Sequence, residues 1–190
     1  AYSDRSLEPA VIRISDSAIG VDADAFSLLG ADRADMDGMT RAATSVRIEL
    51  DHVTAIAGRS LLRVMTETIR DLPDIRFDCR NSILQASSGA APFVLLEGHQ
   101  DADTLLQRLR WTGSRNVLVT GTSEPCLARG LYPQGGDDWP YSFAQWQAQW
   151  QPEWELESEA NTDSQVLTWS PASAISYGSI HLSDFELRPM

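Results

Sequence analysis

Apolar residues in this chain recur with two different periods, and the order of these periods constrains the fold. Residues 45–50 alternate apolar and polar side chains, which predicts a half-buried strand. From residue 59 to residue 72 the spacing is helical, and Pro73 ends the pattern; the apolar positions are Leu61, Leu62, Met65, Ile69 and Leu72. Residues 74–79 alternate again. This order predicts a strand–helix–strand unit.

A second unit of the same kind follows. Residues 92–97 and 116–120 are continuous apolar runs, as in strands buried on both faces. Between them, Asp101 or Asp103 can cap a helix that runs to about Arg110. A further strand is expected at 10–15, and residues 20–40 read as loop with a short helix. Two such units predict an α/β fold of layered strand–helix–strand units with parallel pairing.

The last third has a different character. Asp137, Asp138 and Pro140 predict a helix start, and Pro152 ends that helix. Residues 154–157, 166–169 and 179–187 then read as antiparallel strands, so we expect a β-rich, Trp-rich C-terminal third. We find no internal repeat and expect a single domain over 1–190, with a sub-boundary near 131–138 as an option. The structural alternative is an all-β sandwich, in which residues 59–72 would be extended.

The stretch 46–79 resembles the central strand–helix–strand of STAS domains, which are bacterial interaction modules. The match runs from Val53 through Ile56 into the helix expected at Leu61. The serine that those domains phosphorylate would fall on Gly58 or Arg59. The resemblance therefore implies an interaction fold that lacks the switch residue.

The chain has 15 Lys and Arg residues, and all of them are arginine. The absence of lysine excludes a P-loop, a Schiff-base enzyme and a protein kinase. A net charge of −12 argues against nucleic-acid binding and favours a basic protein partner. The composition, poor in Lys and Asn and rich in Ala and Arg, indicates a GC-rich bacterial coding sequence. No apolar run approaches the length of a membrane span, and we expect no cofactor.

Tryptophans gather in the C-terminal third, where five of the six lie between Trp139 and Trp169. Indole faces stack on sugar rings, so Trp139, Trp154 and Trp169 are candidate ligand-binding residues. Residues 178–187 resemble the closing strand of carbohydrate-binding β-sandwich modules. The alternatives are a protein interface, or a core built from the helical face of Phe143, Trp146 and Trp150.

One arrangement would allow nucleophilic catalysis. Ser123 follows the strand at 116–120 within Gly-Thr-Ser-Glu-Pro, which matches the first part of a Gly-x-Ser-x-Gly elbow. Asp137 or Asp163 and then His181 complete the order Ser, Asp, His. A small serine hydrolase is therefore the second alternative function.

The metal and disulfide candidates are few. His99, Asp101 and Asp103 follow a strand and offer imidazole and carboxylate ligands to a divalent cation. Helix capping by the two aspartates explains them equally. Cys79 and Cys126 can form one bridge or none.

We therefore expect a non-catalytic bacterial interaction domain that binds a protein partner in an assembly or regulatory role. A glycan-binding module of the cell envelope, with a polysaccharide ligand, is the alternative. The compartment stays open between cytoplasm and periplasm or cell envelope.

Overall fold

The structure is a computed structural model that describes part of the chain. The described residues are 9–29, 31–32, 45–66, 70–86, 92–98, 106–119, 128–131, 144–145, 148 and 155–161. Strands dominate them: β1 (Ala10–Val21), β2 (Phe26–Leu29), β3 (Ala31–Asp32), β4 (Ser45–Ala57), β5 (Leu62–Thr66), β6 (Arg70–Asp71), β7 (Asp74–Arg80), β8 (Ile83–Ala86), β9 (Val94–Gly98), β10 (Leu109–Ser114), β11 (Val117–Val119), β12 (Ala128–Leu131), β13 (Glu155–Leu156) and β14 (Glu159–Asn161).

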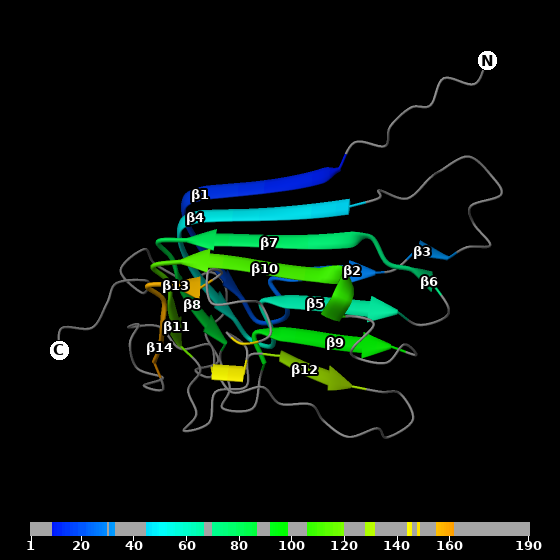
Figure 1. Cartoon of the computed structure of the whole chain (residues 1–190). Helices are drawn as coiled ribbons and strands as arrows, with labels where there is room; N and C mark the ends of the chain where they lie inside the picture. The colour runs from blue at the N-terminus through cyan, green and yellow to red at the C-terminus, as the bar shows by residue number, and fades with distance from the viewer. Residues whose placement is uncertain are drawn as a thin grey trace, which may run out of the picture.

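Nearly all strand pairs are parallel, and together they form stacked coils. The first column contains β13, β10, β7, the first half of β4 and the first half of β1. The second column contains the later halves of β1 and β4, then β8, β11 and β14. The third column contains β2, β5, β9 and β12. The chain visits the columns in turn and returns one level further on, which is a parallel β-helix (Figure 1).

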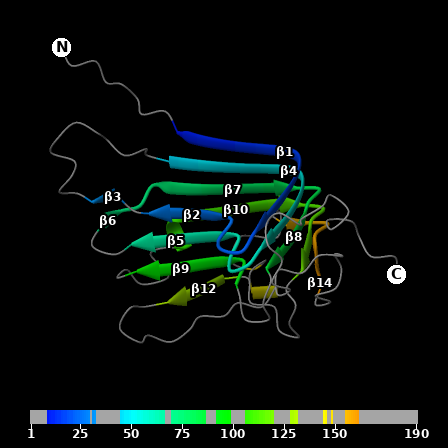
Figure 2. The same cartoon turned by 180° about the vertical axis from the view of Figure 1, so that it is seen from behind.

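The columns lie around one interior. In Figure 1, β7 and β10 of the first column point left, while β5 and β9 of the third column point right. The view from behind shows the third column in front, with β2, β5, β9 and β12 stacked in that order (Figure 2). The second column lies between the first and third columns on one side of this interior. A small antiparallel pair, β3 with β6, stands apart from the columns.

The corner between the first and second columns has the same backbone conformation in every coil. Its residues adopt positive φ angles near 50°; they are Asp16, His52, Asn81, Arg115 and Glu157. Residues of this kind reverse the alternation of side chains and let the strand direction change within one position. Asn116 fixes the corner from inside, because its amide donates to the Cys79 carbonyl at 2.9 Å and accepts from the Ser82 N–H at 3.1 Å.

The core consists of side chains stacked in register between neighbouring coils. Ile48, Phe77 and Trp111 occupy one such row, and each is almost fully buried. The rings of Phe77 and Trp111 are stacked, with centroids 4.3 Å apart and an interplanar angle of 7°. A row of this kind buries apolar surface between coils, which is the main favourable term for stacking them.

The α/β prediction is wrong, since the described residues contain fourteen strands and no helix of seven residues or more. The all-β alternative agrees with this strand content. Within 59–72, β5 and β6 are present in place of the expected helix. The resemblance to STAS domains depended on that helix and is therefore wrong. Leu62 and Val64 point inward from β5 and pair with β9. Leu61 lies buried at the preceding corner, so a corner followed by a strand imitates helical spacing.

Three further predictions need correction. The helix expected to reach Arg110 is confined, in the described part, to 106–108, and β10 begins at Leu109. The strand expected at 154–157 exists as β13, but it pairs in parallel with β10. Of the 20–40 segment, expected as loop, the described part contains the end of β1, β2 and β3.

Among the described segments, no helix has the length and hydropathy that crossing a membrane would require.

Candidate binding surfaces

The outer face of the first column concentrates arginine. We call it the arginine face and define it by Arg13, Arg47, Arg76, Arg80, Arg108 and Arg110. It arises because every second residue of β1, β4, β7 and β10 points away from the core. Four carboxylates share this face: Glu49, Asp51, Asp74 and Asp78. The face therefore carries a formal charge of about +2, opposite in sign to the chain.

Ion pairs and a hydrogen bond connect four strands across this face. Arg13 of β1 donates to Glu49 of β4. Arg47 Nε lies 2.7 Å from Glu49 Oε1 and donates to Asp78 Oδ2 of β7 at 2.9 Å. The hydroxyl of Thr112 on β10 also donates to Asp78. Exposed pairs of this kind contribute about 0.2–1 kcal/mol each, so the network orients side chains more than it stabilises the fold.

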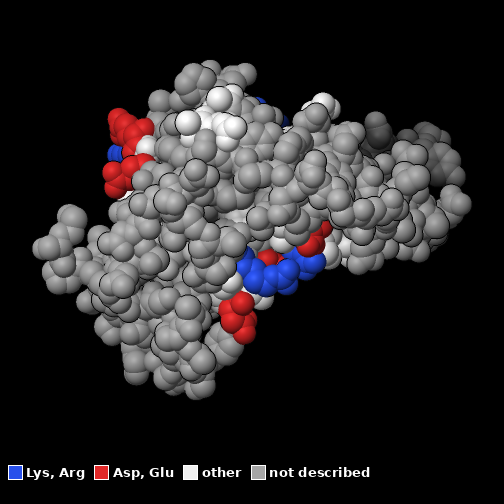
Figure 3. Space-filling view, turned by 90° about the horizontal axis from the view of Figure 1, so that it is seen from below, with Lys and Arg blue, Asp and Glu red and all other residues white. Residues whose placement is uncertain are grey.

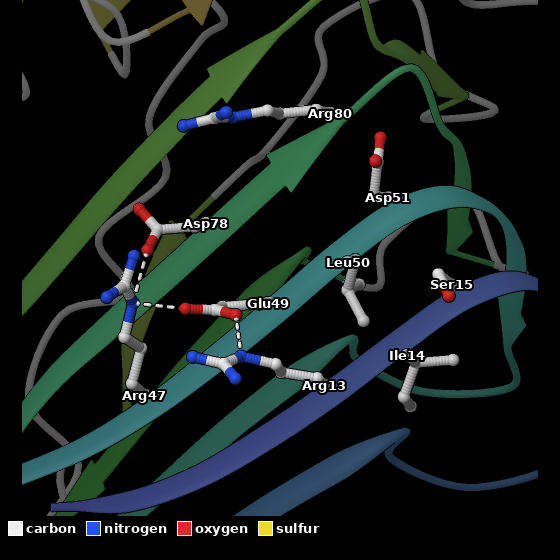
Figure 4. Close-up of a pocket in the computed structure, with 9 residues that line it drawn as sticks. All are labelled: Arg13, Ile14, Ser15, Arg47, Glu49, Leu50, Asp51, Asp78 and Arg80. Carbon is white, nitrogen blue, oxygen red and sulfur yellow. Dashed lines mark hydrogen bonds and ion pairs between the residues drawn. The ribbon is translucent and has the colours of Figure 1, made fainter.

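A pocket of about 310 Å³ opens on the arginine face beside this network. Its lining comes from β1, β4 and β7, and consists of Arg13, Ile14, Ser15, Arg47, Glu49, Leu50, Asp51, Asp78 and Arg80. Figure 4 shows Arg13, Glu49, Arg47 and Asp78 joined in a chain, with no such contact drawn to Arg80. Donors and acceptors are both present, so the pocket can bind a ligand that carries hydroxyl and carboxylate groups.

A second charged cluster lies at the third column. The Asp24 side chain is only 5% exposed and accepts from the Ser60 hydroxyl at 2.6 Å. Arg63 Nη1 lies 3.8 Å from Asp24, and Arg63 Nε donates to Glu97 Oε2 at 2.6 Å. Seen from below, a strip of basic side chains borders acidic side chains (Figure 3). These groups satisfy one another, so the cluster joins the turn before β2 to β5 and β9.

The first coil, β1 and β2, is the most apolar part of the described surface. Val11, Ile12 and Leu29 are 43%, 40% and 54% exposed, and they are the large hydrophobic side chains of the described residues that are exposed. Ile14 and Ile19 are half-buried beside them. Within the described part, β1 pairs with β4 and has no strand on its other edge.

The residues that the sequence nominates for catalysis, sugar binding and metal binding lie outside the described residues. They are Ser123, Asp137, Asp163 and His181; Trp139, Trp154 and Trp169; and His99, Asp101 and Asp103. Trp146, Trp150 and Cys126 lie outside as well. Each of these assignments stays a prediction. In the described part of the chain, no group of three His, Cys, Asp or Glu residues is placed to hold a metal ion.

The arginine face was not predicted from the sequence. The sequence alone shows that Arg47 and Arg76 alternate with apolar residues, which places each of them on the outward side of its strand. What joins them is the register between β4 and β7, which no local pattern reveals.

Comparison with protein-family models, with curated proteins and with solved structures finds no match to this chain.

Proposed function

We propose that this chain is a non-catalytic assembly domain, and that a second copy of the chain is the protein partner that binds the first coil. The observation that carries the proposal is the edge of β1. This strand is twelve residues long, and in the described part it is paired along one side only. Its free edge presents backbone N–H and C=O groups that another strand can pair with.

Side-chain exposure supports the same surface. Ile12 continues the buried row of Ile48, Phe77 and Trp111, yet it remains 40% exposed because no described coil lies beyond it. The end coils of stacked-repeat proteins need a cover for this reason. A strand added to β1 would cover Ile12 and satisfy the edge in one step.

Charge also favours this edge as the contact. Arg13 and Asp16 are the charged residues of β1, so the strand is formally neutral although the chain carries −12. Two copies can therefore meet along β1 without placing their acidic surfaces in contact. The remaining repulsion acts over longer distances, where salt screens it with a Debye length of about 10 Å at 0.1 M. We expect association to strengthen with moderate salt.

Sedimentation velocity across a roughly hundred-fold range of protein concentration tests the proposal. We expect the wild type to dimerise at the upper end and Ile12→Arg to stay monomeric, since the new charge would be buried at the contact. Gln107→Arg is the matched control: it adds the same charge at an exposed position outside the first coil, and should dimerise as the wild type does. A wild type that stays monomeric throughout, or an Ile12→Arg variant that dimerises normally, contradicts the proposal.

A further inference from the structure

Three arginines lie in register across the arginine face. Arg47 of β4 is paired with Arg76 of β7, and Arg76 is paired with Arg110 of β10. Neighbouring strands are about 4.8 Å apart, so the three side chains leave the sheet at that spacing. They form a straight row of positive groups that runs along the stack of coils.

This row is costly for the fold alone. Like charges placed directly opposite on adjacent strands are destabilising. Carboxylates offset part of the cost, because Arg47 contacts Glu49 and Asp78. Among the ion pairs of the described residues, none includes Arg76 or Arg80. In a chain with 27 acidic residues, such a row points to an anionic ligand.

The groups beside the row indicate what else the ligand carries. Ser15, Asp51, Arg80 and Ser114 form a parallel row in register, with hydroxyl, carboxylate and guanidinium groups in turn. Between the two rows lie Glu49, Asp78 and Thr112. These side chains donate and accept hydrogen bonds as a hydroxyl-rich ligand requires. Guanidinium forks bind carboxylates with two parallel hydrogen bonds.

We propose that the arginine face binds a linear acidic polysaccharide laid along the coils, with its carboxylates on the arginine row and its hydroxyls in the adjoining pocket. The neighbouring strands β1, β4, β7 and β10 span about 14 Å at a spacing of about 4.8 Å, which is long enough for a short run of sugar residues. An acidic peptide is disfavoured because protein contacts centre on apolar and aromatic anchors, and among the outward residues of β1, β4, β7 and β10 only Val11 is apolar.

Isothermal titration calorimetry at low salt tests this with three probes: oligogalacturonate, neutral maltooligosaccharide and poly-glutamate. We expect oligogalacturonate to bind, and the double variant Arg76→Gln/Arg110→Gln to weaken its binding at least about tenfold, since two charge-assisted contacts are lost. Arg59→Gln is the matched control: it removes an exposed arginine outside the arginine face and should bind as the wild type does. Arg80→Gln should weaken binding as well.

The outcomes that overturn the proposal are distinct. Wild-type protein that does not bind oligogalacturonate, or a folded double variant that binds it unchanged, rejects the site. Equal binding of poly-glutamate would mean that charge alone is recognised and that the ligand is an acidic peptide. Tighter binding of the neutral sugar would reject the role of the arginine row. Ile12→Arg should leave the titration unchanged, so this inference stands or falls separately from assembly through β1.

Discussion

Single core residues hold successive coils together, and Trp111 is the largest of them. It is 1% exposed and stacks on Phe77 of the preceding coil. Nothing local in the sequence marks it as core, because it follows a segment with helix-capping signals and precedes a strand expected only at residue 116. Its partner lies 34 residues earlier in the chain. Its burial therefore depends on the register between β7 and β10.

We expect Trp111→Ala to lower the free energy of unfolding by about 3–5 kcal/mol, as large aromatic truncations in cores do. Urea denaturation followed by circular dichroism measures the loss. Gln107→Ala, at an exposed position four residues away, should stay within about 0.5 kcal/mol of the wild type. A loss below about 1 kcal/mol for Trp111→Ala would mean that the stacked row does not hold the coils together.

At the scale of the element, alternation and short apolar runs predicted strands well, and helical spacing failed. The strands expected at 10–15, 45–50, 74–79 and 116–120 are confirmed by β1, β4, β7 and β11. Strand alternation is a property of neighbouring residues, so the local sequence carries it. The pattern at 59–72 failed because a buried corner at Leu61 precedes inward-facing Leu62 and Val64. Pairing with β2 and β9 decides the outcome there.

The same corner makes Gly58 sensitive to substitution. The turn from β4 to β5 packs against the turn after β1, and the Gly58 N–H donates to the Val21 carbonyl at 2.8 Å. A Cβ at Gly58 would lie 2.2 Å from the Asp22 carbonyl oxygen, so the two turns would have to separate. We expect Gly58→Ala to destabilise the fold by about 1–3 kcal/mol.

Thermal unfolding monitored by circular dichroism checks the Gly58→Ala effect. Ser27→Ala, on the exposed side of β2, is a control that should leave the melting temperature nearly unchanged. A Gly58→Ala protein as stable as the wild type would show that the first and second coils are not in close contact at this corner.

At the scale of the whole molecule, the coils repeat in space without repeating in the sequence. Residues in register lie 36, 29 and 34 residues apart for Ile12, Ile48, Phe77 and Trp111. Unequal coil lengths remove the fixed period by which repeats are recognised. The sequence therefore indicated parallel strands but not the helical path that connects them. The arginine face and the exposed first coil both depend on that path, so neither was foreseen.

The architecture also separates two surfaces by chemistry. The first coil is apolar and nearly neutral, while the arginine face is polar and positive. The assembly proposed for β1 uses the free edge of that strand, whereas the polysaccharide track uses the outer face of the first column, to which β1 contributes Arg13 and Ser15. The first proposal depends on the strand edge, and the second on the strand face, that the described coils leave exposed.

Assembly through β1 is tested most directly by backbone hydrogen exchange of this strand, measured by mass spectrometry at low and high protein concentration. At low concentration we expect β1 amides to exchange quickly and those of β4 and β7 slowly, because the latter strands are paired on both sides. At high concentration β1 should become protected while β4 and β7 stay unchanged. Exchange in β1 that is independent of concentration, whether fast or slow, would contradict assembly through its edge.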